Sequence, residues 1–248
     1  PILFNFVTDA FSRILSRGAS HGHISPVISH LFPDGDTLLQ YADDTIIMVE
    51  LNDSCIAHLK FILLCFEALS GLKINFSKSE VIITGVDDNE ALRVARLLTC
   101  KLGSFPFKYL GLPISPDVLH SKDFAPAVTK VGNRVLPWRG RYNTNAGKVA
   151  LIYDCLSSLP MFLMGFYLLS AGTHAGFDKH RGAFIGMQQI RRKYRLVKWQ
   201  LMCKPKNLGG LGIINTYVMN KCMLIKWWWK IMSSGAGSLW YAILIAKY

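Results

Sequence analysis

Acidic residues are scarce in the C-terminal part of this sequence. Residues 101–248 contain 21 lysines and arginines but only four aspartates and glutamates, whereas residues 1–100 contain 7 and 12. The net charge of +12 is therefore the sum of −5 and +17, and the whole basic excess lies in the second block. Such a block is typical of a surface that binds a polyanion. The alternative is a solvated surface whose charge serves solubility alone.

The sequence also lacks the short motifs of metal and disulfide modules. Its six cysteines include no C-x-x-C pair, so we expect no zinc module and no disulfide-linked partner, and an intracellular site, nucleus or cytoplasm, fits best. His21, His23 and His30 occur without an H-E-x-x-H motif and are expected in loops. The run LGGLGI, residues 208–213, looks like a phosphate loop, but no G-K-[ST] follows, and a turn into a strand is predicted.

No apolar run is long enough to be an unambiguous membrane span or leader peptide. The longest uncharged stretch, residues 155–174, is interrupted by Pro160 and abutted by Asp154, so we expect a buried helix and strand there. The first residues, PILFNFVTDAF, have no basic leader and no small-residue cleavage pattern. We therefore expect no secretion and no membrane partner. Membrane association through 155–174 is the weakest of the functional alternatives.

Hydrophobic spacing predicts an α+β fold rather than a βαβ repeat. Helices are predicted over residues 4–17, 54–70, 89–102, 122–136 and 145–157. Strands are predicted over 38–41, 45–49 and 81–85, and a tight hairpin or strand pair over 107–114. Ser54 is the expected cap of the second helix and Gly71 its stop. The first part thus reads helix, hairpin, helix, strand.

Two adjacent aspartates, Asp43 and Asp44, lie between two predicted strands in LLQYADDTIIM. Together with Ala42 they are the residues left to connect the strands, so the hairpin carries acid at its tip. Adjacent aspartates are common in turns, and a solvated turn is one interpretation. The other is a metal site, because like charges repel each other unless a cation neutralises them, and carboxylate oxygens suit Mg²⁺. Such a site can run two-metal phosphoryl chemistry.

Six segments of the chain occur in a characteristic order. They are QYADD (40–44), FEALSGLKINFSKSE (66–80), FKYLGLPI (107–114), LSSLPMFLM (156–164), CKPKNLGGLGI (203–213) and KWWWK (226–230). In this order they resemble plant LINE-type, non-LTR retrotransposon reverse transcriptases over nearly the whole chain. A lone Y-x-D-D is a weak signal, but six segments in register are a strong one. The resemblance implies a partial polymerase palm over 1–115, followed by a mostly helical, basic thumb and extension over 116–248.

The resemblance also implies what the acidic hairpin does. Asp43 and Asp44 correspond to the palm carboxylates of an RNA-directed DNA polymerase, which hold Mg²⁺, with Mn²⁺ as an alternative ion. Tyr41 and Ala42 correspond to residues beside the primer end. The implied partners are an RNA template, a DNA primer and deoxynucleoside triphosphates. The implied reaction is nucleotidyl transfer onto the primer 3′-hydroxyl.

Two further segments acquire roles by the same resemblance. Lys78, in NFSKS, corresponds to a lysine that approaches the triphosphate and protonates pyrophosphate; the alternative is an exposed loop lysine. Tyr109, Leu110 and Gly111 correspond to the hairpin that grips the primer terminus, with ordinary hairpin packing as the alternative.

Basic and aromatic residues alternate in RRKYRLVKW, residues 191–199. This pattern suits phosphate contact combined with base stacking, and a solvated helix face is the equal alternative. The basic candidates for nucleic-acid binding are Arg191, Arg192, Lys193, Arg195 and Lys198. Three consecutive tryptophans, residues 227–229, are expected to be packing residues, since three in a row cannot all face one groove.

Several departures from the family pattern argue against activity of the chain by itself. The family has another metal-binding aspartate on a strand before the helix that begins at Pro1, and Asp9 cannot replace it because it lies on that helix. NTNAGK (143–148) and AFIGMQQ (183–189) also differ from the usual pattern. We therefore expect an incomplete and inactive polymerase fragment. The alternative function is a catalytically inactive, nucleic-acid-binding remnant of the same element.

Overall fold

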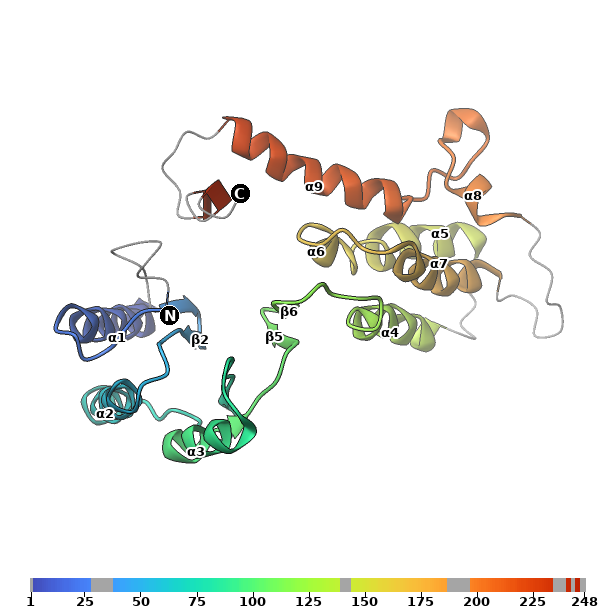
Figure 1. The fold of residues 1–248 in the computed structure, drawn as a ribbon. Helices are drawn as coiled ribbons and strands as arrows, with labels where there is room; N and C mark the ends of the chain where they lie inside the picture. Colours follow the sequence, from blue (N-terminus) through green and yellow to red (C-terminus); the bar gives the residue numbers. More distant parts are fainter. Residues whose placement is uncertain are drawn as a thin grey trace. The chain divides into compact units, whose positions relative to one another are not determined.

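The chain forms two compact units of helices and short strands in a computed structural model (Figure 1). The structure describes residues 2–27, 38–138, 144–186, 197–233, 240–241 and 244–245. The first unit comprises Pro1–Pro116 together with Ile243–Tyr248, and the second comprises Asp117–Ala242. This mixture of helices and small sheets confirms the α+β class.

The first unit combines three helices with three small sheets in its described part. Its helices are α1 (Ile2–Ser20), α2 (Asp53–Ser70) and α3 (Asp88–Leu98). Its strands are β1 (Leu38–Tyr41), β2 (Asp44–Ile47), β3 (Glu80–Val81), β4 (Lys101–Leu102), β5 (Phe107–Tyr109) and β6 (Leu112–Ile114). The pairs β1–β2 and β5–β6 are antiparallel, and β3–β4 is parallel. Two-stranded sheets have little stability alone. The β1–β2 pair and β3 pack against the helices of this unit.

The helix ends differ from the predicted ones at specific residues. Asn52 caps α2, not Ser54: the Asn52 side chain accepts a hydrogen bond from the Ser54 backbone N–H at 3.0 Å, which places Ser54 inside the first turn. Gly71 is the confirmed stop, with a left-handed φ of 71°. The third helix ends at Leu98, because Thr99 turns the chain and residues 101–102 form β4. Of the strand predicted over 81–85, only Val81 is in a strand, because β3 comprises Glu80–Val81.

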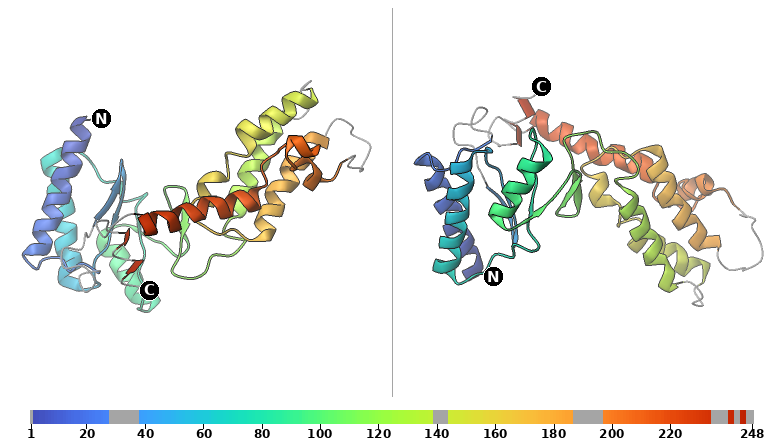
Figure 2. Two further views of the ribbon diagram at one scale, coloured as in Figure 1. Left: turned by 90° about the horizontal axis from the view of Figure 1, so that it is seen from above. Right: turned by 60° about the horizontal axis from the view of Figure 1, so that its bottom comes forward.

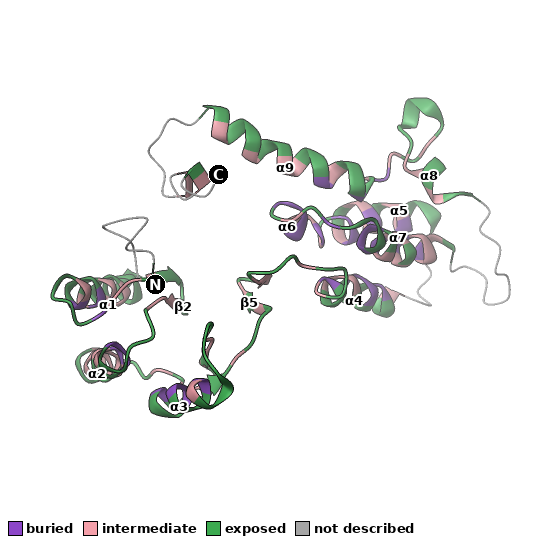
Figure 3. Cartoon of the chain, viewed as in Figure 1, coloured by how far each residue is buried: buried purple, intermediate pink, exposed green. Residues whose placement is uncertain are grey.

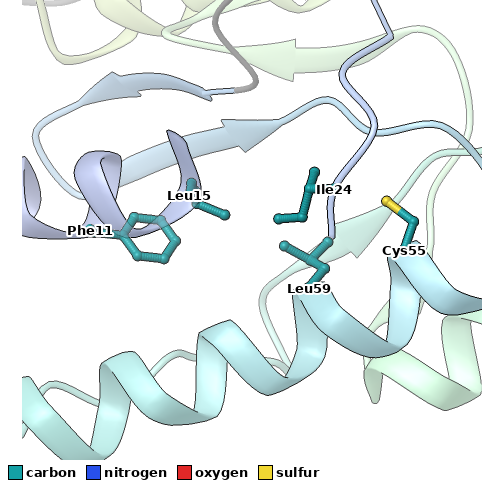
Figure 4. Packing of buried hydrophobic residues seen from close by; sticks show 5 residues of the cluster. All are labelled: Phe11, Leu15, Ile24, Cys55 and Leu59. Atoms are coloured by element: carbon teal, nitrogen blue, oxygen red, sulfur yellow. The ribbon is translucent and has the colours of Figure 1, made fainter. Parts of the chain in front are cut away.

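Apolar side chains from α1, α2 and the segment between them form the core that supports the acidic hairpin. Phe11, Leu15, Ile24, Cys55 and Leu59 are buried against one another, and Figure 4 shows these side chains pointing together from α1, α2 and the chain after α1. The two helices run side by side in both views of Figure 2. Leu38 of β1 and Ile47 of β2 pack onto this core. The hairpin is therefore anchored at its open end, away from its turn.

A second small core joins α2 to α3. Ile56, Val94 and Leu98 are buried in it, and Val49, Val81 and Ile83 pack against them. Val49 contacts both cores. Val49, which follows the acidic hairpin, and Val81 of β3 therefore pack against the same small core of the first unit.

The regular elements of the second unit, in its described residues, are all helices. Its elements are α4 (Ala125–Val135), η1 (Leu136–Trp138), α5 (Asn145–Leu151), the π-helical turn η2 (Ile152–Leu156), α6 (Met161–Met164), α7 (Ala171–Gly186), α8 (Trp199–Met202), η3 (Lys206–Leu208) and α9 (Thr216–Ser233). Helices α4 and α7 pack closely because both carry glycine at the contact. A Cβ on Gly132 would lie 2.7 Å from His180 Cε1, and one on Gly176 would lie 3.0 Å from Val128 Cγ1. Figure 3 shows buried residues on α4, α5, α6 and α7.

Buried polar side chains connect α7 and α9 to their neighbours. Arg181 is fully buried and donates to Ser157 Oγ at 3.1 Å and to the Ile214 carbonyl at 3.0 Å. Asn220 is fully buried as well: its amide donates to the Met164 and Tyr167 carbonyls, and its oxygen accepts from the Leu169 backbone N–H. Because buried polar groups are costly unless paired, these contacts specify how α9 sits on α6 and α7.

Two sequence predictions for this unit are wrong. The stretch 155–174 contains no strand: it passes through η2, a turn and α6, and then enters α7. The residues after LGGLGI form no strand either, and lead directly into α9. Within the described ranges, no helix is both long and apolar enough to cross a membrane.

Candidate functional site

The acidic hairpin has a two-residue turn, not the three-residue connection expected from the sequence. Tyr41 pairs with Asp44, so Asp44 is the first residue of β2, and only Ala42 and Asp43 form the turn. Ala42 adopts a left-handed backbone with φ of 52°. This conformation is rare for a residue with a Cβ.

Strand alternation decides which way the hairpin residues face. Leu38 and Ile47 are paired and pack on the core, so one face of the hairpin is turned toward α1 and α2. Side chains alternate along a strand, which places Tyr41 and Asp44 together on the opposite face. Tyr41 is 65% exposed there. Asp43 is exposed at the turn next to them.

Asp43 and Asp44 are therefore open to solvent at one end of a supported hairpin. Neither carboxylate belongs to an ion pair in the part of the chain that the structure describes. Two adjacent oxygen donors without a cationic partner fit a hard divalent cation such as Mg²⁺. The described ranges contain no group of three His, Cys, Asp or Glu side chains that could hold a metal. In those ranges the carboxylate pair thus stands without a third ligand of these types.

Lys78 lies in a tight turn between α2 and β3. The Asn75 side chain accepts from the Lys78 backbone N–H at 3.1 Å and from Ser77 Oγ at 2.7 Å. Glu67 on α2 accepts from the Ile74 backbone N–H at 2.6 Å and ties this loop to the helix. The Lys78 side chain itself is exposed. The turn fixes the backbone of Lys78 and leaves its ammonium group accessible.

The predicted tight hairpin at 107–114 is confirmed. Tyr109 pairs with Leu112, and Leu110 and Gly111 form the turn with φ of 49° and 85°. Two left-handed residues in a row give the turn geometry that matches the natural twist of paired strands. Tyr109 is half-buried, whereas Leu110 and Gly111 are exposed. The hairpin belongs to the first unit, as do Asp43 and Lys78.

Most of the basic candidates lie outside the described residues. The structure does not describe residues 187–196, which include Arg191, Arg192, Lys193 and Arg195. Lys198 is described, and it is exposed at the N-cap of α8. The Arg181 guanidinium lies 5.0 Å from the Trp199 ring centroid. One face of Trp199 is therefore occupied by a buried cation, so this ring is not a freely exposed stacking surface.

The glycine-rich run at 208–213 has no free backbone amides to offer a phosphate. The N–H groups of Gly209, Gly210, Leu211, Gly212 and Ile213 donate to carbonyls of residues 202–206 at 2.8–3.3 Å. A phosphate-binding loop needs amides that point at the ligand. This segment is a self-bonded turn and no phosphate loop, as the sequence predicts, but the strand that was predicted to follow it is absent from the described residues.

The tryptophan run differs from the expectation that all three residues pack. Trp227 is half-buried and donates to the Gly165 carbonyl at 2.6 Å. Trp228 and Trp229, in contrast, are 67% and 74% exposed on α9. The spacing of α9 contained a signal for this, because Thr216, Asn220 and Trp227 share one helix face and Trp229 lies on the opposite one.

Two comparisons with known proteins find similarity to part of the chain. Residues 1–114 match the family described as reverse transcriptase (RNA-dependent DNA polymerase). A protein of Arabidopsis thaliana described as a putative ribonuclease H protein is 30% identical over 138 residues, which is 55% of this chain. The chain spans only 22% of that relative's length. The segment that matches reverse transcriptases contains both hairpins and Lys78.

Proposed function

From this similarity we propose that the chain is part of an RNA-directed DNA polymerase of a plant LINE-type, non-LTR retrotransposon. One observation carries the proposal: the solvent-open carboxylate pair Asp43–Asp44 lies inside the residues that match reverse transcriptases. In this proposal the first unit is part of the palm, and the second is the thumb and a basic extension. The substrates are an RNA template, a DNA primer and deoxynucleoside triphosphates. The six free cysteines fit an intracellular site in nucleus or cytoplasm.

The acidic hairpin supplies the metal ligands in this proposal. Asp43 and Asp44 hold Mg²⁺, or Mn²⁺, through their carboxylate oxygens, and the packing of Leu38 and Ile47 on the α1–α2 core supports the hairpin that carries them. A bound divalent cation of this kind supplies Lewis-acid activation of a hydroxyl and neutralises phosphate charge. Tyr41 lies on the same hairpin face as Asp44, and with Ala42 it borders the primer end.

The other candidate residues bind and position the substrates. Lys78 approaches the triphosphate and gives a proton from Nζ to the departing pyrophosphate, a role that suits an exposed ammonium on a fixed backbone. Tyr109, Leu110 and Gly111 form the turn that contacts the primer terminus. The basic residues Arg191, Arg192, Lys193, Arg195 and Lys198 contact phosphates of the duplex.

Localised cleavage with Fe²⁺ tests the metal assignment without requiring activity. Fe²⁺ that replaces Mg²⁺ generates hydroxyl radicals in the presence of ascorbate and peroxide, and these cut the backbone near the ion. We expect cleavage of chain 1–248 next to Asp43 and Asp44. The double variant Asp43→Asn/Asp44→Asn should lose this cleavage, because the neutral amides bind the cation far more weakly.

Asp9→Asn is the matched control. Asp9 is also an exposed aspartate of the first unit, but it pairs with Arg13 along α1 and has no proposed role. Its substitution should leave the cleavage pattern unchanged. Cleavage that persists in the Asp43→Asn/Asp44→Asn variant, or that occurs elsewhere in the chain, contradicts the assignment.

A second candidate function is a nucleic-acid-binding remnant that does not catalyse. It is favoured by the net charge of +17 on residues 101–248, which suits phosphate binding and needs no catalytic group. Both candidates bind duplexes, and they differ only in chemistry. Primer extension on an RNA template separates them. The test uses a longer version of the chain that includes an upstream strand with the further metal-binding aspartate. Mg²⁺-dependent extension by that version that disappears in Asp43→Asn supports the polymerase, whereas binding without extension supports the remnant. Extension by chain 1–248 alone would contradict its expected incompleteness.

A further inference from the structure

Helix α9 is held by one face and leaves the other to solvent. On the held face, Asn220 is fully buried and Trp227 donates to the Gly165 carbonyl of α6's C-terminal end. Figure 3 shows most of α9 in the colour of exposed residues. Because the hydrogen bonds of Asn220 and Trp227 fix the rotation of α9 about its axis, the direction of its outer face is fixed as well.

The outer face of α9 carries a continuous apolar stripe. Val218, Ile225, Trp229 and Met232 follow one another at spacings of three, four or seven residues, which is one side of a helix. They are 53%, 62%, 74% and 76% exposed, and Trp228 beside them is 67% exposed. Apolar side chains gathered on one exposed face mark an interaction surface rather than a random surface.

The charge on α9 is entirely positive. The helix contains Lys221, Lys226 and Lys230 and no aspartate or glutamate. The ammonium groups of Lys226 and Lys230 lie 5.4 and 5.6 Å from the centroid of the Trp227 ring, which holds them at the border between the buried face and the stripe. Trp229 lies three residues after Lys226 and is its neighbour on the helix surface, whereas Trp228 is two residues from both lysines and lies on the other side of the stripe. An exposed indole beside a positioned cation suits a ligand that is itself flat, apolar and anionic.

We propose that Trp228 and Trp229 form a stacking surface for the unpaired bases of single-stranded nucleic acid, with Lys226 and Lys230 as phosphate contacts. This inference rests on the proposed function, because that function brings an unpaired template strand to the protein. Single strands present base faces that indoles can stack on, whereas the bases of a duplex are already stacked. A second copy of the chain is the poorer occupant, since pairing two α9 faces would bring lysines against lysines.

Fluorescence anisotropy with labelled oligo-dT and with a blunt RNA–DNA duplex tests the proposal on chain 1–248. The variant Trp228→Leu/Trp229→Leu keeps an apolar surface but removes the aromatic rings. We expect it to lose at least about tenfold in affinity for the single strand and to bind the duplex as the wild type does. Trp228→Phe/Trp229→Phe should retain most of the single-strand affinity. Both residues are exposed, and circular dichroism should show unchanged helix content.

Two further variants separate nucleic acid from other occupants. Met232→Gln removes an exposed apolar side chain of the stripe that cannot stack, so it should leave oligo-dT binding unchanged. Lys226→Gln/Lys230→Gln should flatten the salt dependence of single-strand binding by about 1.4 in the slope of log affinity against log salt. Loss of oligo-dT affinity in Met232→Gln that equals the loss in the leucine variant would instead indicate general apolar docking and would overturn stacking.

The outcomes also distinguish this inference from the proposed function. Equal oligo-dT affinity of the wild type and the leucine variant, with intact duplex binding, overturns the stacking surface and leaves the polymerase proposal standing. A wild type that binds neither nucleic acid refutes both. Binding of the wild type to phosphatidylserine vesicles, together with no binding to oligo-dT, would show that the stripe docks on a lipid surface and would also overturn the inference.

Discussion

At the scale of single residues, backbone strain coincides with the proposed site. Among the described residues, Ala42, Thr99 and Leu110 are the non-glycine positions with left-handed φ, at 52°, 59° and 49°. Ala42 and Leu110 form the turns of the two hairpins assigned to metal and primer, whereas Thr99 ends α3. A left-handed residue with a side chain costs about 1–2 kcal/mol. Strain of this kind persists where the surrounding structure imposes it, and it is frequent at functional sites.

Leu110→Asn tests how much strain the second hairpin holds. Asparagine tolerates the left-handed conformation, and Leu110 is 36% exposed, so its replacement loses some packing. We expect the relief of strain to exceed this loss and the free energy of unfolding to rise by up to about 1 kcal/mol. Urea denaturation followed by circular dichroism measures this. Thr99→Gly removes a β-branched side chain from a left-handed backbone position that has no proposed role, so it should also stabilise the chain. A less stable Leu110→Asn variant would show that packing of the leucine outweighs its strain.

At the scale of elements, the docking of α9 on α7 depends on a buried histidine. His174 of α7 is buried, and its Nδ1 lies 3.1 Å from Thr216 Oγ1 of α9. Burial lowers the pKa of His174 from its ordinary value of 6.5, and the Arg181 charge acts in the same direction, while the hydrogen bond with Asn220 and the nearby Asp178 oppose it. The contact between these helices is therefore built around a neutral imidazole.

The lowered pKa gives stability a definite pH dependence. In the folded chain His174 stays neutral at pH values where the unfolded chain already binds a proton, so protons favour unfolding. Stability should be fully present above about pH 6.5 and should fall as the pH decreases from there toward the folded-state pKa. Urea denaturation between about pH 5.5 and pH 7.5 measures the slope. His174→Gln should be less pH-dependent over this window, and an unchanged dependence would rule out His174 as its source.

The two kinds of element also differ in what holds them. The acidic hairpin depends on two apolar residues, Leu38 and Ile47, packed on the α1–α2 core. Helix α9 depends on the polar contacts of Asn220 and Thr216 as well as on apolar packing. Apolar packing accepts many residue combinations, whereas a buried amide requires particular partners. These polar contacts therefore fix the orientation of α9, and with it the exposure of Trp228 and Trp229, more strictly than apolar packing alone would.

At the scale of the whole molecule, the segregation of charge predicts how binding responds to salt. Residues 101–248 carry a net charge of +17 and residues 1–100 a net charge of −5. Duplexes should therefore bind with little sequence preference and more weakly as salt rises, because phosphate neutralisation releases counterions. The carboxylate pair lies in the acidic block, and the basic excess lies in the other block. Substitutions in one block should therefore change duplex binding without changing metal binding, and the reverse should hold for the other.

Five substitutions test the basic segment within that block. Replacing Arg191, Arg192, Lys193, Arg195 and Lys198 with glutamine should flatten the slope of log affinity against log salt by up to about 4, at roughly 0.7–0.9 per contact. Fluorescence anisotropy from low to moderate salt measures the slope, and Asp43→Asn should leave it nearly unchanged. An unchanged slope in the five-residue variant would mean that this segment is a solvated face and that the duplex track lies elsewhere.

The sequence by itself determined the features that depend on near neighbours. The acidic hairpin, the hairpin at 107–114 and the stop of α2 at Gly71 follow from alternation, turn residues and glycine, all of which act within a few positions. The predicted cap of α2, Ser54, lies two residues after the observed cap, Asn52. Both residue types can cap a helix, and the local pattern does not choose between them. Charge segregation and the likeness to reverse transcriptases also needed no coordinates.

Only the tertiary structure decided which faces are covered. The pairing Tyr41–Asp44 put Asp44 on β2 and beside Tyr41, and the parallel pairing of β3 with β4 joined residues that are far apart in the chain. Arg181 is fully buried although arginine usually lies at the surface, and Trp229 is exposed although tryptophan usually packs. Burial is a property of contacts between distant segments. A local pattern can show that a helix has two faces, but not which one will find a partner.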